Sequence, residues 1–176
     1  MVSGQNSAGQ LCLSCGLCCR GLFHTHGVLN PEEVEGASTI GLKLVEGGQP
    51  AFALPCSKFD GCCTIYEDRP AACRGFRCAL LRRLEDNEIA LEDALDIVSE
   101  ARRLADEAMP EGTAEERAGR FRAHLRIAGN DSRSDGEMSD VDRLRFTALA
   151  LYLDRHFVLA RDGQFYSVEP IASSNS

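Results

Sequence analysis

The sequence predicts a mostly helical α+β fold, in which a small metal-centred, cysteine-rich N-terminal half packs against a C-terminal helical region. Two observations favour this class. All nine cysteines lie between Cys12 and Cys78, and the rest of the chain repeats apolar residues at three- and four-residue intervals, the spacing of amphipathic helices. We expect residues 1–10 to form a disordered tail and residues 11–86 the cysteine-cluster metal-binding region. Residues 87–176 are expected to form a helical region of the same compact domain.

Short elements are expected in the cysteine-cluster region, each from local residue chemistry. Asn followed by Pro is typical of a helix N-terminus, paired glycines permit a turn, and apolar or β-branched residues favour strands. Helical turns are expected at the last two cysteines, Cys73 and Cys78. The expected elements are a helix over 30–38, a turn at Gly47-Gly48, a strand over 50–55, its partner strand over 64–66, a helical turn over 69–74 and a helix over 78–86.

Three helices are expected in the C-terminal region. The first ends before Pro110, and Ser139 followed by Asp142 three residues later is typical of a capping pair that opens the third. A polar loop rich in Asp, Ser and Gly separates the second helix from the third. The expected elements are helices over 91–108, 114–128 and 139–157, a loop over 129–136, and a small hairpin around Asp162-Gly163 within 157–168.

The composition excludes several classes of protein. The chain has 176 residues and a formal net charge of −8, which would repel DNA, RNA and anionic membranes, so we expect no nucleic-acid or membrane partner. The longest apolar stretches have about eight residues, against the roughly 20 that cross a bilayer. The Ser- and Gly-rich start lacks the features of a secretory signal. We therefore expect a cytoplasmic location, where thiols are kept reduced.

The cysteines fall into two groups instead of being scattered along the chain. The first is a CxxCxxCC run. An odd number of cysteines and no recognisable secretory signal disfavour a disulfide framework. A buried thiol would explain one or two positions, but not spacings of three, three and one. Thiolate ligation of a metal ion or cluster explains the pattern best. The groups are Cys12, Cys15, Cys18 and Cys19, then Cys56, Cys62, Cys63, Cys73 and Cys78.

The spacing of the first group suits a metal centre but leaves the metal open. Gly16 can adopt a positive φ, so the chain can form a tight turn and direct backbone amides at sulfurs. A Cys-x-x-Cys-x-x-Cys run occurs in ferredoxin-type iron–sulfur ligation, whereas zinc sites usually combine two Cys-x-x-Cys pairs. Adjacent residues point in different directions, so Cys18 and Cys19 are expected to face different ligand groups or a second metal.

Charged and imidazole side chains near the cysteines have possible roles at such a centre. A four-thiolate zinc site or cubane cluster carries a charge of about −2, which cations would offset. The arginines beside cysteines are Arg20, Arg69, Arg74 and Arg77, and of these Arg20 and Arg74 are favoured for this role. His24 and His26 could ligate zinc or iron, but with eight thiols available an ordinary, partly exposed position is favoured. Glu32 and Glu33 are expected only to stabilise a helix N-terminus.

Residues 12–80 resemble the YkgJ-type CxxCxxCC cysteine-cluster family of zinc- or iron-chelating proteins. The resemblance rests on the CxxCxxCC run and on the segments CCTIYEDRP over 62–70 and CRGFRC over 73–78. It implies metal or cluster binding but no agreed reaction. Cys62 stands where the family usually has a polar or small residue, which makes it the odd thiol. The metal ligands that the resemblance implies are Cys12, Cys15, Cys18, Cys19, Cys56, Cys63, Cys73 and Cys78.

Three functions are open from the sequence. The leading one is a metal-binding protein that holds zinc, iron or an iron–sulfur cluster through its two cysteine groups. The alternative is an iron–sulfur or iron-dependent redox or modification enzyme, for which no catalytic residue can be named. A thiol-redox switch at Cys18-Cys19 or Cys62-Cys63 ranks third. No Walker loop, Rossmann glycine pattern, G-x-S-x-G or HExxH motif is present.

Overall fold

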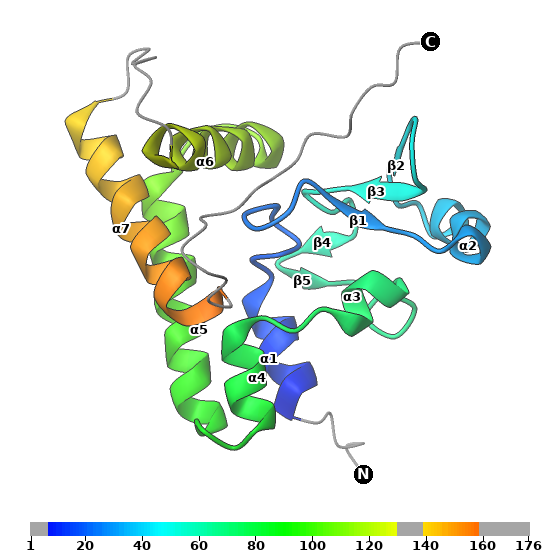
Figure 1. Cartoon of the computed structure of the whole chain (residues 1–176), viewed down its shortest axis with the longest axis horizontal. Helices are drawn as coiled ribbons and strands as arrows, with labels where there is room; N and C mark the ends of the chain where they lie inside the picture. The colour runs from blue at the N-terminus through cyan, green and yellow to red at the C-terminus, as the bar shows by residue number, and fades with distance from the viewer. Residues whose placement is uncertain (1–6, 130–138, 159–176) are drawn as a thin grey trace. The chain divides into compact units, whose positions relative to one another are not determined.

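The computed structural model describes residues 7–129 and 139–158, which form two compact units (Figure 1). The helical unit consists of residues 7–15 and 77–158 within this range, and the loop-rich unit of residues 16–76. The chain therefore leaves the helical unit after its first helix and returns to it at Arg77. Helices outnumber strands, and the first two cysteines pack with the C-terminal helices. The mostly helical α+β class is confirmed.

Five helices build the helical unit, and α5 lies at its centre. Small apolar residues recur along the buried face of α5, which allows neighbouring helices to approach closely. This helix contacts α7, α1 and α4, and α6 contacts α7. The buried residues of α5 are Ala94, Val98, Ala101, Ala105 and Ala108. The helices are α1 (Ser7–Cys15), α4 (Ala79–Glu85), α5 (Leu91–Ala108), α6 (Ala114–Gly129) and α7 (Asp140–Phe157).

Caps and aromatic contacts define the last two helices. The Ser139 hydroxyl accepts a hydrogen bond from the Asp142 amide at 3.1 Å, as expected from the sequence. At the start of α6, the Thr113 amide donates to the Glu116 carboxylate and the Glu116 amide donates to the Thr113 hydroxyl, a capping box. The rings of Phe121 on α6 and Phe146 on α7 lie 6.1 Å apart and are both buried. Local chemistry thus sets the helix ends, and aromatic packing joins the two helices.

The loop-rich unit is built around a small antiparallel sheet with the strand order β1-β3-β2. A 3-10 turn, η1, leads into α2, and a small core of Leu29, Ala37, Leu42 and Phe52 supports the sheet. Gly47 and Gly48 both have positive φ and form the expected turn between β2 and β3. The elements are β1 (His26–Val28), η1 (Pro31–Glu33), α2 (Val34–Thr39), β2 (Leu44–Val45) and β3 (Ala51–Ala53).

The second half of this unit carries cysteines on very short elements. They are the two-stranded hairpin of β4 (Phe59–Asp60) and β5 (Cys62–Cys63), and α3 (Ala71–Gly75). The expected pairing of the strand over 50–55 with residues 64–66 is wrong. Both edges of β3 are taken by β1 and β2, while the amide and hydroxyl of Thr64 donate to the Lys58 carbonyl at 3.0 and 2.9 Å and close a turn. The expected helical turn that carries Cys73 is confirmed.

The division of the chain differs from the expected one in two places. Residues 7–10, expected in a disordered tail, begin α1, because Leu11 is buried and α1 contacts α5 and α4. Residues 77–86 belong to the helical unit, not with the rest of the cysteine-cluster region. Residues 1–6, most of the expected loop over 129–136 and nearly all of the expected hairpin over 157–168 lie outside the described residues.

Candidate metal centre

Three of the expected ligands lie in the helical unit. Cys12 and Cys15 are three residues apart on α1, so they lie on the same side of that helix. The C-terminal end of α1 is held by Arg102 of α5, whose guanidinium donates to the Ser14 carbonyl at 2.7 Å. Cys78 is the N-cap residue of α4, a helix that contacts α1.

The thiol of Cys78 accepts a backbone hydrogen bond. Its sulfur lies 3.4 Å from the amide nitrogen of Leu81 in the first turn of α4. Burial raises the pKa of Cys78, while the amides of Leu81 and Leu80 act in the opposite direction because they favour the thiolate. A metal ion that displaced the proton would leave a sulfur whose negative charge these amides already stabilise.

Gly16 follows α1 and begins a tight turn that contains Cys18 and Cys19. Its φ is 66°, and the ring of Phe59 occupies the position that a Cβ atom would take. The amide of Arg20 donates to the Gly16 carbonyl, and the amide of Gly21 donates to the Cys18 carbonyl, both at 2.9 Å. The positive φ expected at Gly16 is therefore present, and the residue cannot be exchanged for a larger one without strain.

Cys56 links the second group of cysteines to this turn. Its amide donates to the Cys19 carbonyl at 2.7 Å, across 37 positions of the sequence. Its half-buried side chain packs against the core of the loop-rich unit, and its sulfur lies 3.4 Å from the amide nitrogen of Lys58. Burial raises the pKa of Cys56, and the Lys58 amide opposes that change. The fold thus fixes the backbone of Cys56 beside the first cluster.

The adjacent cysteines Cys62 and Cys63 differ in their surroundings. Both lie on β5, where neighbouring residues point to opposite faces of the hairpin. Cys62 is exposed, whereas Cys63 is half-buried and carries a charge interaction with Cys56. Gly61, with a φ of 71°, makes the turn between β4 and β5. The two thiols therefore point to opposite faces of the hairpin.

The thiols of Cys56, Cys63 and Cys73 come from three separate segments and lie close enough for their charges to interact. Cys73 is on α3, and its amide donates to the Pro70 carbonyl at 3.0 Å. Although the residue as a whole is solvent-exposed, burial of its thiol, followed by the charges of Cys56 and Cys63, raises the pKa of Cys73 to about 11. At neutral pH this thiol is protonated when no metal is bound.

Glu33 holds the start of α3, a role that the sequence analysis missed. Its carboxylate accepts hydrogen bonds from the Ala71 amide at 2.7 Å and from the Asn30 amide at 3.0 Å. Arg74 lies 3.8 Å away. The two amides lower the pKa of Glu33, because each bond favours the ionised carboxylate. The capping-box position of Glu33, three residues after Asn30, is a local signal, but its contact with Ala71, 38 positions along the chain, has none.

The arginines beside the cysteines take different roles. Arg74, one of the two favoured as counter-charges, donates to the Arg69 carbonyl at 2.6 Å as well as pairing with Glu33. Arg77 pairs with Glu85 at 2.9 Å. Arg69 instead lies over the ring of Tyr66, 3.5 Å from its centroid, and its charge lowers the pKa of Cys73. Two cations thus act on thiols, Arg69 on Cys73 and Lys58 on Cys56, and the sequence singled out neither.

The two histidines make other contacts, and the buried Nε2 atom of His24 has no hydrogen-bond partner among the described residues. The ring of His24 packs edge-on against Phe76, with centroids 5.0 Å apart, and burial lowers the pKa of His24. A ring nitrogen of His26, Nδ1, lies 2.9 Å from the Thr25 hydroxyl. Among the residues described, no three His, Cys, Asp or Glu side chains are gathered tightly enough to hold a metal ion. Binding would therefore require the cysteine side chains to draw together.

The donor set nevertheless fits zinc or iron. The candidate ligands are thiols, which are preferred by zinc and by iron–sulfur clusters. Two of the sulfurs accept backbone amides, as sulfurs at metal centres do. None of the nine cysteines forms a disulfide. A cysteine-rich chelating domain is the class of site that these features define.

Comparison with known proteins agrees with this class. Residues 11–95, just under half of the chain, match the CxxCxxCC family model, described as "Putative zinc- or iron-chelating domain". The family recognised in the sequence is confirmed, and its description supports metal binding as the general function. Neither a curated protein nor a solved structure matches the chain. Within the described ranges, none of the helices has both the length and the apolar character needed to cross a membrane.

Proposed function

We propose that residues 11–95 bind zinc or iron through cysteine thiolates, and that Cys56, Cys63 and Cys73 form the nucleus of the centre. The observation that carries the proposal is that three separate segments of the loop-rich unit each hold one of these cysteines, and that the Cys56 amide is bonded to the Cys19 carbonyl of the CxxCxxCC run. The charges of Cys56 and Cys63, which raise the pKa of Cys73, agree with it. The family match supports the choice of metals. A shared negative charge is unfavourable without a cation, and a divalent metal ion is the cation that thiolates bind best.

The raised pKa values of Cys56 and Cys73 mean that metal binding must displace protons from these thiols. Each cysteine that becomes a ligand releases its proton to solvent as its sulfur binds the metal. Three thiolates and one divalent ion make a centre with a net charge of −1, and a fourth thiolate makes it −2. The amide of Lys58, already directed at the Cys56 sulfur, favours this charge. Binding should therefore be accompanied by proton release and by ordering of the loop-rich unit.

The other proposed ligands come from the family resemblance. The backbone bond between Cys56 and Cys19 makes the CxxCxxCC turn the nearest source of a further thiolate within the loop-rich unit. We leave Cys62 out of the set because it is adjacent to Cys63 on β5 and so points to the opposite face of the hairpin. The full proposed set is Cys12, Cys15, Cys18, Cys19, Cys56, Cys63, Cys73 and Cys78.

Anaerobic purification followed by metal and acid-labile sulfide analysis tests the proposal. Cys63→Ser should lower the metal content per chain, and Cys62→Ser, its neighbour, should leave the content at the wild-type value. Iron with sulfide and visible charge-transfer absorbance would assign an iron–sulfur cluster, whereas a colourless zinc protein would assign thiolate zinc. Full-length protein that neither carries nor takes up zinc or iron would contradict the proposal. Equal metal content in both variants would contradict the choice of Cys63.

A further inference from the structure

Arg69 is a partly buried cation that no acid balances in the part of the chain that the structure describes. Its guanidinium carbon lies 3.5 Å from the centroid of the Tyr66 ring. The Nε atom is buried and has no hydrogen-bond acceptor. A guanidinium that loses water without gaining an anion is costly, so such a group usually has a counter-charge.

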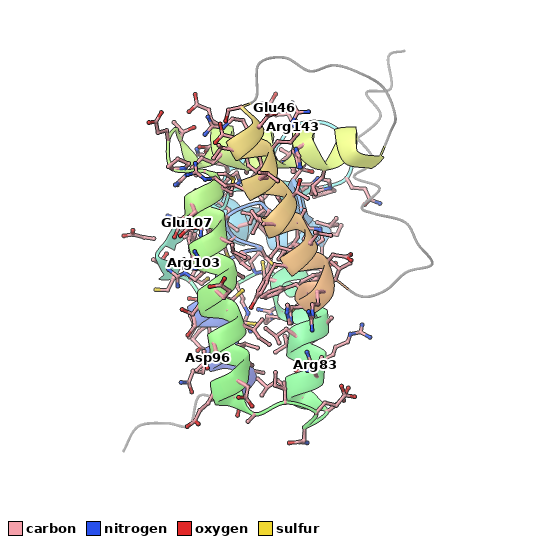
Figure 2. The ribbon with its side chains drawn as sticks, turned by 90° about the vertical axis from the view of Figure 1, so that its left-hand side faces the viewer. Glu46, Arg83, Asp96, Arg103, Glu107 and Arg143 are labelled. Atoms are coloured by element: carbon pink, nitrogen blue, oxygen red, sulfur yellow. The ribbon has the colours of Figure 1, made fainter. Side chains whose placement is uncertain are left out.

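Other arginines of the chain show what Arg69 lacks. Arg77 lies 2.9 Å from the Glu85 carboxylate and Arg74 lies 3.8 Å from that of Glu33. On the outer face of α5, Arg103 pairs with both Glu100 and Glu107, and Figure 2 shows Arg103 and Glu107 side by side there. Arg69 instead has an aromatic face, which holds a cation in place without neutralising it. Its position is thus preorganised for an anion.

The nearest source of negative charge is the thiol group of the loop-rich unit. Arg69 is four positions before Cys73, and the intervening Pro70 starts α3, which carries that cysteine. The charge of Arg69 lowers the pKa of the Cys73 thiol, against the combined effect of burial and of Cys56 and Cys63. Lys58, the other cation that acts on this group, lowers the pKa of Cys56. Without a metal, the Cys73 thiol, with a pKa of about 11, is protonated at neutral pH and gives the guanidinium no counter-charge. A centre of three or four thiolates and a divalent ion would carry −1 or −2.

We propose that Arg69 is the counter-cation of the metal–thiolate centre formed by Cys56, Cys63 and Cys73, and that Tyr66 holds it there. This inference rests on the proposed function, because only metal binding makes the thiol group negative. Arg69 is a positioning and charge-balancing residue, not a ligand. Its stacked, buried guanidinium would replace solvent as the group that stabilises the anionic centre. Tyr66 would keep the loss of side-chain entropy on binding small.

Cobalt(II) binding by the full-length, reduced, metal-stripped protein tests the inference. Thiolate-to-cobalt absorbance gives the signal, and competition with a chelator of known affinity gives the dissociation constant. Arg69→Gln should weaken Co²⁺ binding by about 10–100-fold, the effect of removing an outer-sphere partner of a metal site. Arg69→Lys, which keeps the charge, should recover part of the loss. Arg103→Gln removes one exposed positive charge from α5 and should bind Co²⁺ as the wild type does.

Thermal unfolding separates charge balance from a structural role. If Arg69 only supported the fold, Arg69→Gln would lower the melting temperature of the metal-free protein. The charge-balance account predicts that metal-free Arg69→Gln melts no lower than the wild type, and that added Co²⁺ raises its melting temperature less. A metal-free variant that melts lower but binds Co²⁺ with wild-type affinity would overturn the inference.

Cys73→Ser distinguishes failure of the inference from failure of the proposed function. If Cys73→Ser weakens Co²⁺ binding while Arg69→Gln leaves it unchanged, the thiol centre stands and Arg69 is not its counter-cation. If Cys73→Ser binds Co²⁺ as tightly as the wild type, or the wild type shows no thiolate-to-cobalt absorbance, the proposed centre is wrong. In that case the role proposed for Arg69 is wrong as well.

Discussion

The two units of this protein are stabilised in different ways. The helical unit has two helices of 18 residues, α5 and α7, whose apolar faces bury residues such as Val98, Leu149 and Leu153. In the loop-rich unit the strands have two or three residues, and the core cluster consists of Leu29, Ala37, Leu42 and Phe52. Side-chain packing explains the first unit. The loop-rich unit is held together mostly by turns and by single hydrogen bonds between distant segments, and it contains half-buried thiols.

This difference indicates where a metal would contribute to folding. Short strands and a small core rarely offset the conformational entropy of about 60 residues without a further cross-link. Six of the nine cysteines, including the three whose charges interact, lie in the loop-rich unit. Metal ligation would join segments that are far apart in the sequence, as a cross-link does. We therefore expect the two units to respond differently to metal removal and to mutation.

Metal removal should have the largest effect, and that effect should be confined to the loop-rich unit. Structural zinc contributes apparent binding free energies of about 10–16 kcal/mol in zinc-finger peptides at neutral pH, so its loss can exceed the stability of a small unit. Hydrogen–deuterium exchange before and after chelation should show loss of amide protection in residues 16–76 and retained protection in α5 and α7. Equal loss of protection in both units would contradict the comparison.

Leu149→Ala should destabilise the helical unit by about 2–5 kcal/mol, because the wild-type side chain is 0% exposed and its removal leaves a cavity. Denaturant unfolding should give the same loss with and without metal, since the packing of α7 does not depend on thiolates. Leu151→Ala, on the exposed face of the same helix, is the matched control and should change stability by less than about 0.5 kcal/mol. A metal-dependent loss for Leu149→Ala would show that the units are coupled.

Glu33→Ala should destabilise the loop-rich unit by about 1.5–3 kcal/mol, the usual contribution of a hydrogen bond to a charged group. Its carboxylate is 19% exposed and ties α3 to the segment before α2. The neighbouring Glu32→Ala should have little effect, because Glu32 is exposed. Hydrogen–deuterium exchange at α3 measures the difference. Equal effects of the two substitutions would contradict the assigned role.

The same interaction predicts a pH dependence. The pKa of Glu33 is lowered from its ordinary value of 4.5 by backbone amides. The unfolded state therefore binds a proton more readily than the folded state, and the stabilisation by Glu33 is complete above pH 4.5. It should be lost as the pH falls through the lowered folded-state pKa. Glu33→Ala should flatten this decline in acid-unfolding curves, whereas Glu32→Ala should not.

Ser139→Ala should have the smallest effect, about 1 kcal/mol, because it removes the N-cap of α7. The loss should not depend on metal. Circular dichroism during thermal unfolding of metal-loaded and metal-free protein measures it. A loss that appears only in metal-loaded protein would place the start of α7 under the control of the metal centre.

Local patterns predicted the helical unit well. The helices over 91–108 and 139–157 agree with α5 and α7 because their apolar period and caps involve residues at most four positions apart. The helix α1 was missed. The segment Ser7–Cys15 has a weak apolar period, and contacts with α5 and α4 support its helical form. The strand pairing was wrong for a similar reason, since strands of two or three residues give almost no periodic signal.

The sequence by itself determined which residue types could form the centre. Nine cysteines at those spacings are visible without a fold, and so is the need for a positive φ at Gly16. The tertiary structure alone decided the contacts of Cys56 with Cys19 and of Glu33 with Ala71. The physical reason is the separation of the contacting residues along the sequence. Caps and turns depend on neighbouring residues, whereas contacts across nearly 40 positions depend on how all the intervening chain folds.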